Sequence, residues 1–130
     1  MNIAFKAIRD EGQLNKERLV LRVVLPDDIG KYLVCETEAA EDGANISNNV
    51  RRAYWFPDQK VKTGDLVVLY TKDGVDKIKK HGTGSTSHFF YWGLPTPIWN
   101  EKQSAVVIIR ASEWAYEVLA EPQDTDDTDE

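Results

Sequence analysis

Short apolar runs that alternate with polar residues dominate this chain. In RLVLRVVL (18–25), every second residue from Leu19 to Leu25 is apolar, which is the period-two pattern of a half-buried strand. No window of about twelve residues carries the 3.6-residue apolar stripe of an amphipathic helix. Comparable strand-like runs occupy 3–8, 31–37, 51–56, 60–71, 88–94, 105–111 and 114–120. Runs at intervals of roughly ten residues predict an all-β fold, a sandwich or a barrel.

Turn residues separate these runs. PDDIG (26–30) predicts a turn, because Pro26 presets its φ angle and Gly30 is free to adopt a positive φ. The polar stretch 38–49 predicts a loop that has room for one helical turn. A second turn is expected at 63–65, directly before the most apolar strand of the chain.

The stretch SHFFYWGLPTPIWN (87–100) contains five aromatic residues, two prolines and one glycine. Gly93 ends the aromatic run where the backbone must turn, and Pro95 and Pro97 lack the N–H that a central strand would use. We therefore predict that Trp92 and Trp99 lie in the core between two facing sheets. A ligand-stacking surface is the alternative interpretation.

The composition fits one domain, which we place at residues 1–120. The chain of 130 residues is 42% hydrophobic, enough for a packed core without metal or disulfide bonds. Its single cysteine excludes an intramolecular disulfide, and Cys35 is predicted to be a buried, unreactive thiol. The last ten residues, 121–130, hold six of the 22 acidic residues and no basic one. The net charge of −6 therefore belongs to this segment, predicted to be a disordered acidic tail.

The N-terminal residues and the length of the apolar runs predict the cellular compartment. The first residues lack a basic start followed by a long apolar run, and no 18 apolar residues stand together. We therefore expect a cytoplasmic protein with no membrane span.

Three segments occur in an order that points to a family: DDIGKYLVCET (27–37), YWFPDQKVKTGDLVVLYT (54–71) and FFYWGLPTPIWNEKQSAVVII (89–109). Together, over roughly residues 18–111, they resemble the lamin tail domain. The resemblance implies an immunoglobulin-like antiparallel β-sandwich of about seven to eight strands. It also implies a non-enzymatic binding or structural assembly module without a cofactor, whose partner is another protein.

The connection 72–88 carries the main candidate site. Its residues Lys77, Lys79, Lys80 and His81 precede a Gly-Thr-Gly-Ser run, whose N–H groups could hold an anion. With Arg51 and Arg52 beside an aromatic run, these residues support the alternative of a small nucleic-acid- or anion-binding domain. A flexible, solvated loop explains the same composition, and we expect residues 73–87 to be mobile.

The two histidines lack the spacing of a metal site or of a catalytic group. His81 and His88 are seven residues apart, and no third ligand or nucleophile accompanies them at a recognised spacing. We therefore interpret both as exposed loop residues and assign no catalytic and no metal-binding residue.

Overall fold

A computed structural model describes residues 1–41, 44–101 and 103–120. The predicted acidic tail, 121–130, lies outside the described residues. The described residues form ten strands: β1 (Ile3–Arg9), β2 (Arg18–Val23), β3 (Asp27–Asp28), β4 (Tyr32–Glu38), β5 (Arg52–Trp55), β6 (Lys60–Val61), β7 (Leu66–Tyr70), β8 (Lys77–Lys80), β9 (Thr86–Tyr91) and β10 (Ser104–Arg110). A short 3-10 helix, η1 (Ile29–Lys31), joins β3 to β4.

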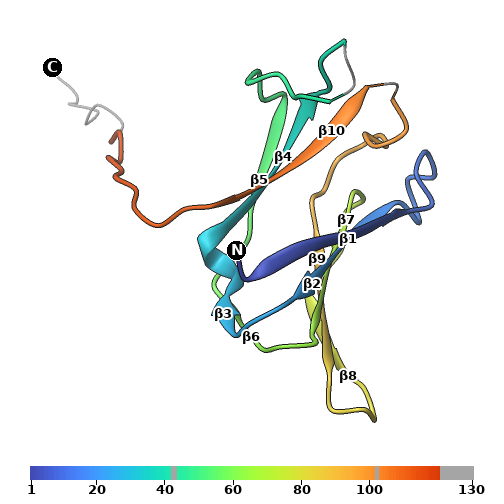
Figure 1. Cartoon of the computed structure of the whole chain (residues 1–130), viewed down its shortest axis with the longest axis vertical. Helices are drawn as coiled ribbons and strands as arrows, with labels where there is room; N and C mark the ends of the chain where they lie inside the picture. Colours follow the sequence, from blue (N-terminus) through green and yellow to red (C-terminus); the bar gives the residue numbers. More distant parts are fainter. Residues whose placement is uncertain (42–43, 102, 121–130) are drawn as a thin grey trace, which may run out of the picture.

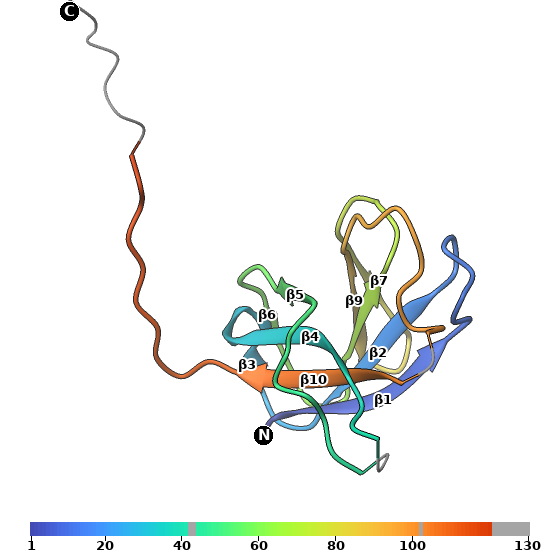
Figure 2. The same ribbon diagram turned by 90° about the horizontal axis from the view of Figure 1, so that it is seen from above.

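The strands form two main sheets that pack in a sandwich-like arrangement (Figure 1). One sheet has the order β1-β2-β7-β9-β8, and the other has the order β10-β4-β5. Figure 2 shows the strands of the smaller sheet crossing those of the larger one. All pairs are antiparallel except β7 and β9, which run parallel. The predicted all-β class is confirmed; the immunoglobulin-like assignment stays a prediction.

The core lies between the two sheets and follows the period-two pattern. Leu19, Leu21 and Val23 of β2 are at most 1% exposed and face Tyr32 and Val34 across the sandwich. Arg18, Val20 and Arg22 alternate with them and point to the outside of the larger sheet, where Arg22 is exposed and Val20 is 7% exposed. Alternation along β2 therefore defines one buried face and one outer face.

One of the two tryptophans predicted to lie in the core does so: Trp99 is 7% exposed. Trp92 is only half-buried, and its ring lies 6.2 Å from that of Trp99 and 5.8 Å from that of Tyr54. Tyr54 in turn contacts Phe56 edge-on at 5.1 Å. Gly93 has a φ of 80°, which confirms that the backbone turns there in a conformation that favours glycine.

A fully buried carboxylate, Glu17, holds this aromatic connection in place. One oxygen accepts hydrogen bonds from the backbone N–H of Ile98 and from the hydroxyl of Thr71, at 3.0 and 2.5 Å. The other accepts from the backbone N–H of Gly12 and of Trp99, at 2.9 and 3.3 Å. Glu17 thus joins three loops at one end of the sandwich and satisfies backbone donors that have no strand partner.

Three local predictions are wrong. Residues 114–120 form no strand and are exposed. The connection 72–88 is not a structureless loop, because β8 pairs with β9 through a tight turn around Gly84. Gly30 does not adopt a positive φ; glycine is required there because a Cβ atom would lie 2.8 Å from the Cα atom of Asp58.

Candidate functional site

The basic residues predicted from the sequence lie on β8 and at its end, but they do not form one cluster. Lys77 pairs with Phe89, and Lys79 pairs with Ser87, so both point to the outer face of the larger sheet. His81 reaches the same face, where its Nε2 atom lies 2.7 Å from the hydroxyl of Ser87. Lys80 lies on the other face, where it lines a second pocket. Alternation along β8 therefore divides the predicted anion site between two surfaces.

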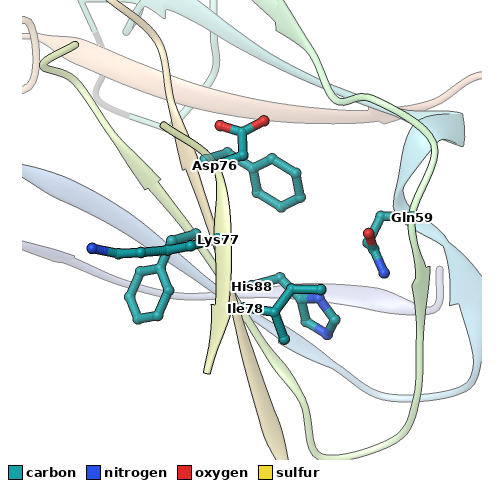
Figure 3. A pocket seen from close by; sticks show the side chains of 7 residues that line it. Gln59, Asp76, Lys77, Ile78 and His88 are labelled. Carbon is teal, nitrogen blue, oxygen red and sulfur yellow. The ribbon is translucent and has the colours of Figure 1, made fainter. Parts of the chain in front are cut away.

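The inner side of β8 faces a pocket of about 260 Å³, which Figure 3 shows. Gln59 forms one wall, and Ile78 and His88 form the opposite wall. Lys77 points away from Gln59 in this view, so its ammonium group lies outside the pocket. The lining combines polar groups with the apolar side chains of Ile78, Phe89 and Phe90 and includes the carboxylate of Asp76, so the pocket carries little positive charge.

His88 is not the exposed loop residue that was expected: it is 4% exposed and pairs with a buried carboxylate. Its Nε2 atom lies 3.0 Å from Asp65, which also accepts hydrogen bonds from the backbone N–H of Lys62 and of Thr86. Burial would raise the pKa of Asp65, but the hydrogen bonds from His88 and from the two backbone groups outweigh it and lower the pKa. This pair locks the turn before β7 to β9.

The His88–Asp65 pair resembles the base and orienting acid of a hydrolase, but Ser87 cannot complete it. Successive residues of a strand point to opposite faces, so the Ser87 hydroxyl faces His81 and not His88. Among the described residues, no group of three or more His, Cys, Asp or Glu side chains could hold a metal ion. We therefore interpret the pair as structural.

Arg51 and Arg52, the other cations predicted for nucleic acid, are engaged inside the chain. Arg52 lies 2.6 Å from a carboxylate oxygen of Glu36, and Arg51 lies 3.4 Å from the other oxygen. Glu36 is completely buried. These two guanidinium groups thus compensate a buried charge, which is costly to leave unpaired.

The outward side of the β10-β4-β5 sheet is apolar, which single-strand patterns did not reveal. Ile109, Leu33 and Trp55 form one row across the three strands. Val107, Cys35 and Ala53 form the next row. We call these six residues the outer apolar face. Ile109 and Trp55 are 42% and 46% exposed, and Cys35 is buried between its neighbours, as predicted.

Beyond this face the chain continues as an extended segment, residues 112–120, which we call the arm. Its backbone leaves the sheet after Ala111 donates to the carbonyl of Lys31, and it projects away from the sandwich in both views (Figures 1 and 2). The ring of Trp114 contacts that of Trp55 edge-on at 5.3 Å. Beyond it, Tyr116 and Val118 are 84% and 78% exposed. The arm thus starts at the outer apolar face and carries further apolar side chains away from it.

The outer side of the larger sheet has a different character, because cations are concentrated there. Its rows contain Arg9 beside Arg18, and Arg22 in the same register as Lys79. The Nζ atom of Lys72 lies 5.0 Å from the centre of the Tyr70 ring, a cation–π contact. With Lys77 this surface, the cationic face, holds six basic residues: Arg9, Arg18, Arg22, Lys72, Lys77 and Lys79.

Comparison with known families finds no matching family model, and comparison with curated proteins finds no match. The similarity to the lamin tail domain therefore stays a resemblance carried by the three quoted segments. Within the described part of the chain, no helix has the length and apolarity needed to cross a membrane.

The sequence contained signals for some of these features. The run AVVII in β10 is apolar at consecutive positions, which is typical of a strand covered on both sides. The period-two apolar residues of 114–120 predict a strand, but in the structure they belong to the arm. Nothing in NKERLV indicates that Glu17 is buried, because its partners lie up to 82 residues away.

Proposed function

We propose that this protein is a non-enzymatic binding module that assembles with other proteins through the outer apolar face. The observation that carries the proposal is the two rows Ile109–Leu33–Trp55 and Val107–Cys35–Ala53, which contain no charged residue. The side of a sheet that points to solvent normally carries polar residues. Exposed contiguous apolar surface of this kind marks interaction sites.

The surroundings of the face support the same function. β10 pairs only with β4 among the described strands, so its second edge is free. The apolar surface continues around that edge into a groove of about 370 Å³ lined by Phe5, Ile8, Val106 and Ile108. Trp55, half-exposed and fixed by a hydrogen bond from its Nε1 atom to the carbonyl of Gly30, suits the anchor of an interface.

A pull-down from an extract of the source cells tests this function. The full chain should retain specific proteins, and Ile109→Lys should lose them, because it places a charge on the outer apolar face at a side chain that is 42% exposed. Val75→Lys is the matched control, since Val75 is 84% exposed and lies away from this sheet. Equal capture by all three chains would contradict the proposal.

A second candidate function is binding of single-stranded nucleic acid on the cationic face. The observation that favours it is the presence of six basic residues on one side of the larger sheet, next to Tyr70 and Phe89. A labelled oligodeoxythymidine should bind with an affinity that falls as salt rises. Lys77→Glu with Lys79→Glu should reduce that binding at least tenfold, and binding that ignores both salt and charge reversal would contradict it.

A further inference from the structure

One chain contains both an uncovered apolar face and an uncovered apolar arm. The arm alternates, with Trp114, Tyr116 and Val118 separated by Ala115 and Glu117. This is the pattern of a strand that packs one side on an apolar surface. All three apolar side chains are more than half exposed, and the arm makes no ladder with the chain's own sheets. The arm therefore has the pattern of a strand that packs on an apolar surface, and no apolar surface from the described part of the same copy covers its side chains.

The geometry of the arm determines which surface that can be. It departs from the end of β10 and crosses toward β5, where Trp114 meets Trp55. From there it runs away from the sandwich in both views (Figures 1 and 2). Tyr116 and Val118 are 84% and 78% exposed, so they do not cover the chain's own face, where Ile109, Trp55 and Ala53 stay exposed. A second copy placed opposite would present the same exposed side chains to this arm.

The dimensions and the chemistry fit such an exchange. Six extended residues, 114–119, span roughly 20 Å. Three strands are crossed in roughly 10 Å, since neighbouring strands lie about 4.8 Å apart. Neither the six residues of the face nor Tyr116 and Val118 carry a charge, so apolar surface meets apolar surface on both sides. A two-fold axis makes both contacts at once, because each copy donates one arm and one face.

We propose that two copies of this chain form a symmetric dimer by exchanging arms, with Tyr116 and Val118 of each copy packed on the outer apolar face of the other. The inference rests on the proposed function, because it names the partner of the same surface. It also gives the edge-on Trp55–Trp114 contact a role: it fixes the direction in which the arm leaves its own sheet.

Sedimentation equilibrium of the full chain, from about 1 to about 100 μM, tests the dimer. The natural chain should be dimeric in the upper part of this range. Ile109→Lys, which alters the face, and Tyr116→Ser with Val118→Ser, which alters the arm, should each shift the midpoint of dimerisation at least tenfold. Val75→Ser, the matched exposed control, should not shift it. The arm variant changes only residues that are at least 78% exposed, so it should fold normally.

Mixing the two variants gives the decisive result. A pair made of one face variant and one arm variant keeps one intact arm-on-face contact, so the mixture should associate more strongly than either variant alone. A natural chain that stays monomeric, or a dimer that neither variant weakens, would overturn the arm exchange. A mixture no stronger than its components would also overturn it. If the natural chain is monomeric but Ile109→Lys still loses captured proteins, the arm exchange is refuted and the protein-binding function stands. If the natural chain is monomeric and Ile109→Lys captures the same proteins, the protein-binding function is refuted as well.

Discussion

Replacing Glu17 with Gln should lower the free energy of unfolding by about 2–4 kcal/mol, although the two side chains have the same shape. The carboxylate is completely buried and accepts four hydrogen bonds, two on each oxygen. Gln retains one oxygen and replaces the other with an NH2 group. If this group takes the place of the oxygen bound by Thr71, the Thr71 hydroxyl can rotate and accept from it, but the N–H of Ile98 then faces another donor.

The magnitude follows from counting these changes. Each hydrogen bond to a charged group contributes about 1.5–3 kcal/mol, and a buried donor without a partner costs about 1–3 kcal/mol. Two bonds are weakened by loss of the charge, and one backbone donor loses its acceptor. Some relaxation of the loop around Ile98 reduces the sum to the stated range.

Urea unfolding followed by tryptophan fluorescence measures the effect, because Trp99 lies directly beside the carboxylate. Glu113→Gln removes the same charge at an exposed position of the arm and should change stability by less than about 0.5 kcal/mol. Thr71→Val combined with Glu17→Gln should be non-additive, because the two residues share a hydrogen bond. A loss below about 1 kcal/mol for Glu17→Gln would refute the assignment of Glu17 as the anchor of this connection.

Three further predictions concern the core, acid stability and the thiol. Trp99→Ala should cost about 3–5 kcal/mol, and the half-buried Trp92→Ala clearly less, both measured by urea unfolding; equal losses would contradict the burial difference. Burial would raise the pKa of Asp27, but hydrogen bonds, the strongest from the Tyr32 hydroxyl, lower it from 3.8 to about 2. The ionised Asp27 therefore contributes about 2 kcal/mol to the free energy of unfolding above pH 3.8, and this contribution is lost as the pH falls toward 2. Asp27→Asn should remove this pH dependence, which urea unfolding measured between about pH 2 and 5 would show. Burial raises the pKa of the Cys35 thiol, so a thiol reagent at pH about 8 should label it far more slowly in the native chain than in urea; equal rates would show that it is accessible.

The all-β class and most strands could be predicted because they depend on local alternation. A run such as RLVLRVVL can bury one side only as a strand, and β2 follows it with every inward residue at most 1% exposed. Burial of Trp99 was also predictable, since Pro95 and Pro97, just before it, prevent a central strand there. These features need no knowledge of distant parts of the chain.

The candidate sites were less predictable because they depend on pairing. Lys77, Lys79 and Lys80 are neighbours in sequence, yet their positions opposite Phe89, Ser87 and Thr86 place them on two faces. The sequence places His88 next to a polar stretch and so predicts an exposed residue, but in the structure β9 brings its Nε2 atom within 3.0 Å of Asp65. The sequence predicts that Arg51 and Arg52 are available to a ligand, but in the structure both guanidinium groups pair with Glu36 of β4.

The sequence by itself determined which residues can form strands, where turns interrupt them and where the acidic residues gather, because these depend on each residue and its neighbours. Only the tertiary structure decided which faces meet and which stay open. The apolar run of β10 predicts cover on both sides, but only the sheet that β10 forms with β4, and β4 with β5, reveals that Ile109 on the second side is 42% exposed. Likewise, alternation in 114–120 predicts a strand, and only the geometry shows that no strand of the described residues pairs with it. Strand register joins residues far apart in sequence, so surfaces built from several strands are decided by the fold.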